Sequence, residues 1–139
     1  MPCDGIVVQG AQVAINLEER LRGSQETREG LRTYLVECGI QGVGEWRPGG
    51  DPMLSVAGGD LYFRAERIKV YKQTRSGQAQ NAANALEAAQ QYASELMQAD
   101  VLQAFRAAGY HTWGVQQKSD NAVLVLETVP KRGPSNVWY

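Results

Sequence analysis

The stretch "YFRAERIKVYKQTRSG", from Tyr62 to Gly77, decides how this 139-residue chain divides into sheet and helix. Apolar and aromatic residues alternate with charged ones along it, which predicts one long strand from Leu61 to Gln73. After Gly77 the chain has no glycine or proline until Gly109 and is rich in Ala, Gln, Leu and Glu, which predicts helix. The sequence therefore changes from sheet to helix at Gly77.

Upstream of this stretch, "IVVQGAQVAI" from Ile6 to Ile15 alternates well enough to predict a strand, with Gly10 marking a bulge, a bend or a turn. Ser24 is placed to cap a helix over residues 25–38, and Gly39 is placed to end it. Glycines and prolines divide residues 40–57, which predicts short strands joined by turns around Trp46 and Leu54.

Downstream, the helical region has an apolar stripe that predicts its buried face: Ala82, Leu86, Ala89, Ala93 and Leu96. Asp100 is a candidate N-cap that would divide the region into two helices, and one bent helix is the alternative. Residues 110–117, the polar turn "KSDN" and residues 122–129 predict a closing β-hairpin whose last, valine-rich strand suits the centre of a sheet.

This order of elements predicts an α+β fold, a two-layer sandwich with a mainly antiparallel sheet and helices on one face. Length and the absence of repeats or linkers predict a single domain over residues 1–139. Residues 130–139 end in Val137, Trp138 and Tyr139, and so apolar a tail predicts docking on the body or on a neighbouring subunit.

The formal net charge of -1 and the isoelectric point near 5.8 exclude a global electrostatic attraction to nucleic acid or membranes. No secretion signal or membrane-spanning stretch is recognisable, so we expect a cytoplasmic protein without membrane contact. Cys3, Cys38 and His111 lack the close spacing of a zinc site, so no metal or other cofactor is expected. Cys38 is expected to be a small buried apolar residue.

The basic stretch admits two interpretations. On a strand, Arg67, Lys69 and Tyr71 share one face and could hold phosphates and stack a base. The alternative is that these charges solvate the outer face of the sheet or protect an exposed edge strand, and it is favoured. The residues assigned to this candidate nucleic-acid or phosphate-binding strand 64–75 are Arg64, Arg67, Lys69, Tyr71, Lys72 and Arg75.

No enzymatic motif is present: the chain lacks G-x-S-x-G, a Walker loop and H-E-x-x-H. The carboxylates of Glu18 and Glu19 are interpreted as solvated charges, and the glycine-rich segments as turns. We therefore expect no catalytic residues.

The start "MPCDG" and the stretch "QQYASELMQADVLQAFRAAGYHTWGVQQKSDNAVLVLE" resemble a family of small uncharacterised proteins of cyanobacteria, chloroplasts and some phages. That family is related to the hypothetical chloroplast reading-frame proteins, a domain-of-unknown-function class. The matching positions are Tyr92, Gly109 and Tyr110, where a helix leads through a glycine and an aromatic residue into a closing hairpin. The resemblance supports the fold and implies no enzymatic activity.

These observations predict a non-enzymatic binding or adaptor protein that acts through protein–protein contacts, with a protein partner or self-assembly into a homo-oligomer. Trp46, Trp138 and Tyr139 join the basic strand as candidate interface residues, because aromatic residues and arginine are enriched at interface cores. Nucleic-acid or phosphate-ligand binding through strand 64–75 is the alternative.

Overall fold

The computed structural model describes residues 5–119 and 122–130. Its contacts divide the chain into two compact units, Met1–Ala93 and Ser94–Tyr139. The expected single domain over residues 1–139 stays a prediction. The expected docking tail, with Trp138 and Tyr139, lies outside the described residues, as does Cys3.

The described elements are β1 (Ile6–Gln12), α1 (Leu17–Gly23), α2 (Gln25–Glu37), β2 (Met53–Val56), β3 (Gly59–Arg64), β4 (Arg67–Gln73), the 3-10 helix η1 (Thr74–Ser76), α3 (Ala79–Ala107), β5 (Tyr110–Ser119) and β6 (Ala122–Pro130). The boundary between the two units falls inside α3. Helix α2 begins as expected, because the Ser24 side chain accepts a hydrogen bond from the backbone N–H of Thr27 at 3.1 Å.

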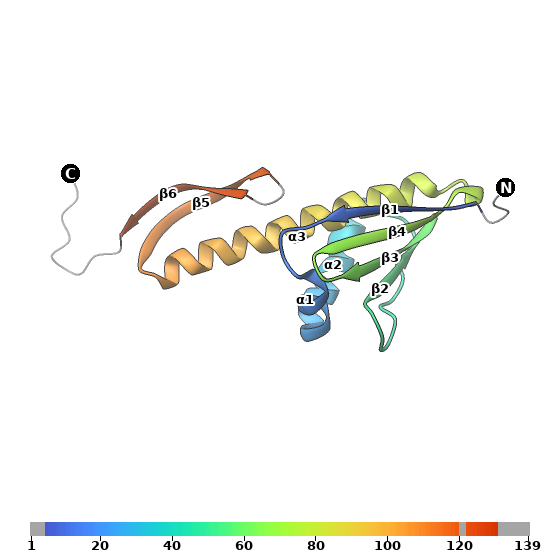
Figure 1. Ribbon diagram of the computed structural model, residues 1–139, viewed down its shortest axis with the longest axis horizontal. Coiled ribbons are helices and arrows are strands. Elements are labelled where there is room, and N and C mark those ends of the chain that lie inside the picture. Colours follow the sequence, from blue (N-terminus) through green and yellow to red (C-terminus); the bar gives the residue numbers. More distant parts are fainter. Residues whose placement is uncertain (1–4, 120–121, 131–139) are drawn as a thin grey trace. The chain divides into compact units, whose positions relative to one another are not determined.

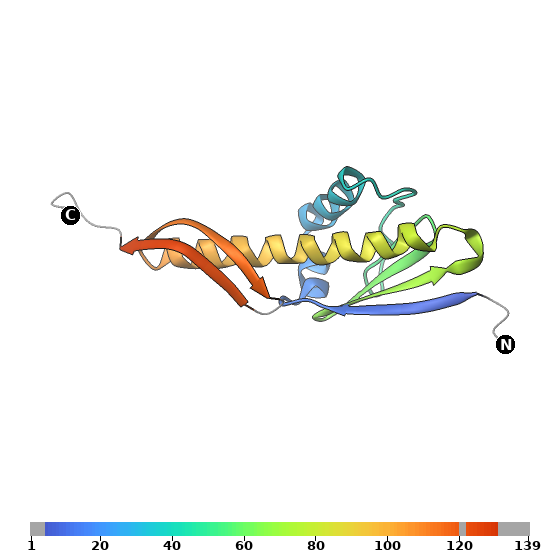
Figure 2. The same ribbon diagram turned by 90° about the horizontal axis from the view of Figure 1, so that it is seen from above.

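The first unit contains a four-stranded antiparallel sheet in the order β1-β4-β3-β2 (Figure 1). Helices α1, α2 and the start of α3 lie on one side of it (Figure 2). Leu61 lies opposite Val70, and Phe63 lies opposite Ile68, so the buried side chains of neighbouring strands share one face. The predicted α+β fold with a mainly antiparallel sheet is confirmed.

The single long strand predicted from Leu61 to Gln73 is wrong, because the chain reverses at Ala65 and Glu66 between β3 and β4. Ala65 has a φ of 51°, a left-handed conformation that turns usually assign to glycine or asparagine. The prediction missed this turn because "RAER" contains neither residue.

Three further expectations are corrected by the structure. Gly10 lies inside β1, whose pairing with β4 continues without a shift of register, so it marks no bulge, bend or turn. Cys38 is exposed rather than buried, because it follows the last turn of α2. Helix α1 was not predicted, although Asn16 caps it by accepting from the N–H of Glu19 at 3.0 Å.

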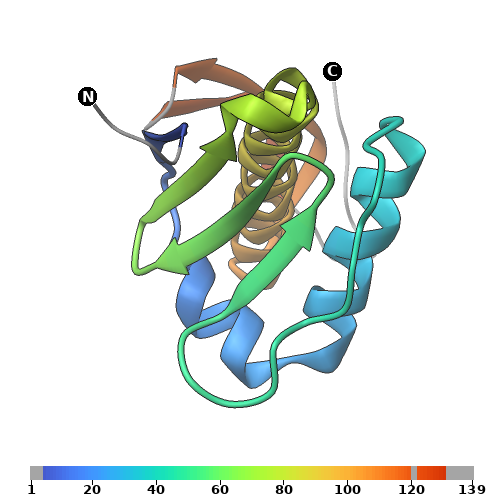
Figure 3. The same cartoon turned by 90° about the vertical axis from the view of Figure 1, so that its right-hand side faces the viewer.

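The core of the first unit lies between the inner face of the sheet and the three helices. Its fully buried or nearly buried members include Leu17, Leu21, Leu31, Leu35, Leu54, Leu61, Phe63, Ile68, Val70, Ala82, Ala85, Leu86, Ala89 and Ala93. The predicted stripe of α3 is thus buried up to Ala93. In Figure 3 the strands pass across the start of this helix.

Helix α3 approaches the sheet closely because small residues meet at the contact. A Cβ atom added to Gly59 would lie 2.5 Å from the carbonyl oxygen of Tyr71 and 2.9 Å from the Cβ of Ala82. The side chain of Asn81 fixes the helix start, since it donates to the carbonyls of Ala57 at 2.7 Å and Gln41 at 3.0 Å. It also accepts from the N–H of Gln41 at 2.9 Å, so this side-chain amide uses its oxygen and its nitrogen to hold the contact.

The second unit contains the end of α3 and the antiparallel hairpin of β5 and β6. The predicted hairpin is confirmed, and Gly109 precedes it with a φ of 94°. Within the described residues β6 pairs only with β5, so the expected central position of this strand is wrong. Helix α3 continues through Asp100, which excludes the division into two helices.

None of the helices in the described part of the chain combines the length and the apolar character that crossing a bilayer requires.

The close contact at Gly59 predicts that Gly59→Ala lowers the free energy of unfolding by about 1–3 kcal/mol, because a backbone carbonyl and a helix must both move. Gly10→Ala is the matched control, since its added Cβ meets no atom closer than 3.8 Å. Chemical denaturation of both variants measures the difference. Equal stability of the two variants would contradict the close packing of α3.

Candidate functional site

The basic strand lies inside the sheet, because β4 pairs with β1 on one side and with β3 on the other. The interpretation that its charges protect a sheet edge is therefore wrong. The predicted alternation is confirmed: Ile68 and Val70 are buried, while Arg67 and Tyr71 are exposed on the opposite, outer face together with the half-buried Lys69. This outer face carries the charges that could meet a ligand.

Of the remaining members of the predicted strand site, Arg64 shares the outer face with Arg67, whereas Lys72 and Arg75 do not. Arg64, at the end of β3, forms an ion pair with Asp51 at 3.0 Å. Lys72 is on the inner side of β4 and donates to the side chain of Gln9 at 2.9 Å. Arg75 lies in η1, beyond the sheet. Four of the six predicted residues, Arg64, Arg67, Lys69 and Tyr71, therefore share the outer face, and two lie away from it.

Arg67 and Lys69 are the cations of the outer face that have no internal partner. Among the described residues, neither side chain has a hydrogen-bond or ion-pair partner. Two depressions of about 410 and 350 Å³ share these two residues and Gln12. The smaller one also includes consecutive residues of β1, so it follows the edge of this strand.

Strand β1 carries an exposed apolar surface. Four of the five large hydrophobic residues exposed in the described part lie on β1 and its neighbour β4: Ile6, Val7, Val8 and Tyr71. Val8 is 53% exposed and lies directly opposite Tyr71 on the outer face. We name the set of Val8, Gly10, Gln12, Arg67, Lys69 and Tyr71 the β1–β4 surface.

The backbone of β1 is also open on the side away from β4. Thr74 donates to the carbonyl of Gly5 at 2.7 Å, and Val13 donates to the carbonyl of Glu66 at 2.9 Å, so odd-numbered residues face β4. Because successive residues of a strand point in opposite directions, the N–H and C=O groups of Val8, Gly10 and Gln12 face away from β4. No described strand pairs with them.

The sequence reasoning missed this surface because it concentrated on charge. The signal was present in "IVVQGAQ", which contains no charged residue and no proline and so lacks the usual protection of an edge strand. Its position at the edge depends on the strand order, which the alternation of residues does not specify.

Trp46 is half-buried and packs against a core residue, away from this surface. Its indole N–H donates to the carbonyl of Arg28 at 2.9 Å, and its ring centroid lies 5.5 Å from that of Phe63. Trp46 forms an isolated antiparallel β-bridge with Leu54 of β2. Strand β2 is the edge strand opposite to β1. The structure therefore gives this predicted interface residue a packing role.

A third depression, of about 380 Å³, is lined by residues that include Trp46 and the arginines Arg22, Arg28 and Arg47. These arginines already donate to protein oxygens. Arg28 donates to the carbonyl of Leu21 at 2.6 Å, and Arg47 donates to that of Asp51 at 2.9 Å. Their guanidinium groups are used to hold the loop, which disfavours an anion site here.

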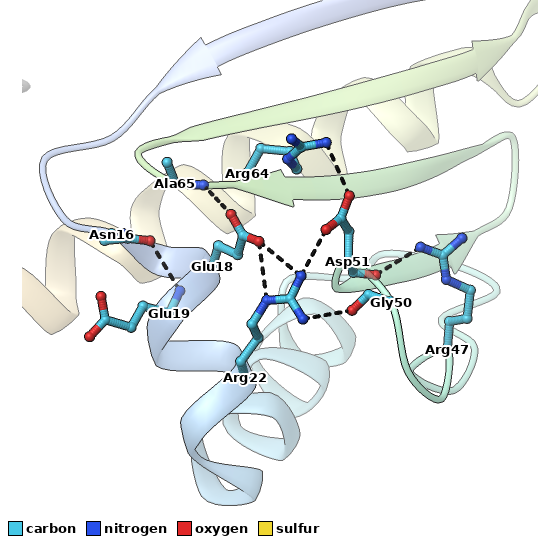
Figure 4. A network of polar contacts seen from close by, with 9 residues as sticks. All are labelled: Asn16, Glu18, Glu19, Arg22, Arg47, Gly50, Asp51, Arg64 and Ala65. Carbon is cyan, nitrogen blue, oxygen red and sulfur yellow. Dashed lines mark hydrogen bonds and ion pairs between the residues drawn. The ribbon is translucent and has the colours of Figure 1, made fainter.

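A polar network joins α1 to the β3–β4 turn and to the loop before β2 (Figure 4). The Glu18 carboxylate accepts from the N–H of Ala65 at 2.7 Å and from Arg22 at 3.0 Å. Arg22 also forms an ion pair with Asp51 at 2.7 Å, and Asp51 forms a second ion pair with Arg64 at 3.0 Å. The Ala65 hydrogen bond and then the Arg22 guanidinium lower the pKa of Glu18 below its ordinary value.

The network compensates for the strained turn. The Glu18 carboxylate accepts from the backbone N–H of Ala65, the residue with the positive φ. This hydrogen bond therefore stabilises the left-handed conformation of the turn. The interpretation of Glu18 as a solvated charge is wrong.

Within residues 5–119 and 122–130, no cluster of three or more His, Cys, Asp or Glu side chains could hold a metal ion. The chemistry of the β1–β4 surface is that of hydrogen bonding, apolar contact and positive charge.

Comparisons of the chain with family models, with curated proteins and with solved structures gave no match. The resemblance carried by Tyr92, Gly109 and Tyr110 therefore stays a prediction. In the first unit Tyr92 has a structural role, since its hydroxyl donates to the carbonyl of Thr27 at 3.0 Å.

The Glu18 contacts predict a pH-dependent contribution to stability. The pKa is lowered on folding, so the contribution is present above the unfolded pKa and is lost as the pH falls through the folded pKa. Glu18→Gln keeps an acceptor for Ala65 but removes the charge, so we expect a loss of about 1 kcal/mol at neutral pH. Urea denaturation should show this loss shrinking as the pH falls below about 4.

Glu19→Gln is the control, because it changes the net charge equally while its carboxylate contacts no described side chain. It should change stability by less than about 0.5 kcal/mol. A loss for Glu18→Gln that is equally large at acidic and neutral pH would contradict the role of the charge.

Proposed function

We propose that this chain is a non-enzymatic binding protein that recruits a protein partner through the β1–β4 surface. The observation that carries the proposal is the open edge of β1, where exposed apolar side chains coincide with outward-facing backbone groups. An edge of this kind accepts an additional strand, and the main-chain hydrogen bonds supply affinity.

The contrast with the rest of the sheet supports this proposal. Natural edge strands are usually blunted by charge, proline or a bulge, and β1 has none of these. Its neighbour β4 is the strand that carries the charge. An unprotected apolar edge next to unpaired cations is costly to leave exposed and suits a surface that is covered in use.

One observation favours the alternative, nucleic-acid binding. The rings of Tyr62 and Tyr71 lie 5.1 Å apart on the outer face beside Lys69, and aromatic and basic side chains together can hold single strands. However, the two rings contact each other edge to face, and Arg47 lies over Tyr62 at 5.8 Å. The expected cytoplasmic location and the absence of catalysis stay predictions.

Val8→Pro tests the proposal selectively. The N–H of Val8 faces away from β4, so proline removes a donor for an added strand and leaves the β1–β4 hydrogen bonds intact. We expect the variant to fold and to lose its partner. The measurement is capture from native lysate by the tagged full chain, with and without nuclease.

Val8→Thr is the matched control, because it keeps the backbone donor and a β-branched side chain. The partner should survive nuclease treatment and remain bound to this control. Retention of the same partner by Val8→Pro would overturn the role of the β1 edge. Loss of all partners on nuclease treatment would favour nucleic-acid binding.

A further inference from the structure

We propose that the occupant of the β1–β4 surface is an extended, acidic segment of another protein, which adds to β1 as a fifth strand. This inference rests on the proposed function and deepens it by assigning the chemistry of the partner. The partner's segment carries an apolar residue that lies near Val8 and Tyr71. It also carries carboxylates that lie near Lys69 and Arg67.

The surface is divided along its length into an apolar and a cationic part. The register places Tyr71 beside Val8, Lys69 beside Gly10 and Arg67 beside Gln12. Side chains of an added strand that face outward would continue these three rows. One end of the segment therefore meets apolar groups, and the other end meets two positive charges.

Gly10 gives the partner access to Lys69. The nearest side-chain atom to a Cβ added at Gly10 is the Cγ of Lys69, at 3.9 Å, so no β1 side chain separates this lysine from the open edge. At the next row Arg67 stands beside the neutral Gln12. Glu66, in the β3–β4 turn, is the acid among the residues that line the larger depression. Its single carboxylate stands against two cations without a partner in the described part, Arg67 and Lys69.

Charge favours a foreign acidic strand over a second copy of this chain. β1 has no acidic residue, so pairing two copies through β1 would place four cations on the same outer face without a carboxylate from either β1. The acid on that face of β3, Asp60, is half-buried and already accepts a hydrogen bond from the hydroxyl of Ser55 at 2.7 Å. An acidic segment supplies the missing charge.

Two fluorescent probe peptides test the inference with the full chain: Thr-Val-Thr-Glu-Thr-Glu-Thr and its counterpart with lysine in place of glutamate. Both are also made in reversed order, because either strand direction could be used. For the better direction, the acidic peptide should bind about tenfold more tightly than the basic one, as expected for two partly exposed ion pairs.

The double variant Arg67→Glu with Lys69→Glu should reverse this preference, and Val8→Pro should abolish binding of both peptides. Reversal is a gain of binding to the basic peptide, so it cannot result from unfolding. Salt should weaken the acidic complex of the unmodified chain.

Other outcomes overturn the inference in distinguishable ways. Equal affinity for both peptides, lost in Val8→Pro, would refute the acidic partner and leave strand addition at β1 in place. If neither peptide binds at millimolar concentration and the chain forms a dimer that dissociates in Val8→Pro, the edge is assigned to a second copy. Binding of oligouridine that depends on Arg67 and Lys69 but not on Val8→Pro would refute both proposals.

Discussion

The structure of the first unit depends on the close approach of α3 to the sheet. Gly59 and Ala82 leave no space for larger groups, and Asn81 ties the start of the helix to two loop carbonyls. A helix with an alanine face packs near the backbone and buries the inner side chains of β2, β3 and β4. The cover ends before β1, where Val7 on the inner face is 47% exposed.

This limited cover connects the fold to the candidate function. β4, which would be vulnerable as an edge, is protected by pairing on both sides, and its charges project from the outer face. β1 receives hydrogen bonds from one side alone within the described residues. The apolar and cationic groups are thereby brought to one surface by two strands that are separated by about half of the chain.

Much of the fold was predictable because local signals agreed with the tertiary structure. Ser24 and Gly39 bracket α2, and the glycine-free region after Gly77 becomes α3. The turn at Ala65 was not predictable from composition, because a remote carboxylate, Glu18, holds a residue that has no turn preference of its own. Here a tertiary hydrogen bond replaces the usual glycine.

The candidate site was predicted in part. Alternation placed Arg67, Lys69 and Tyr71 together, and the structure confirms that shared face. Alternation could not predict the ion pair of Arg64 with Asp51 or the hydrogen bond of Lys72 to Gln9, because those partners are distant in sequence. It also could not show that β1 is the edge, since strand order is a property of the whole sheet.

The open edge of β1 is tested most directly by residue-resolved amide hydrogen exchange. In the isolated protein, the amides of Val7, Gln9 and Ala11 should exchange slowly because they face β4, while those of Val8, Gly10 and Gln12 should exchange rapidly. A saturating acidic peptide should then slow the second group alone. Even-numbered amides that are already protected in the isolated monomer, or that stay rapid when the peptide is bound, would contradict strand addition at β1.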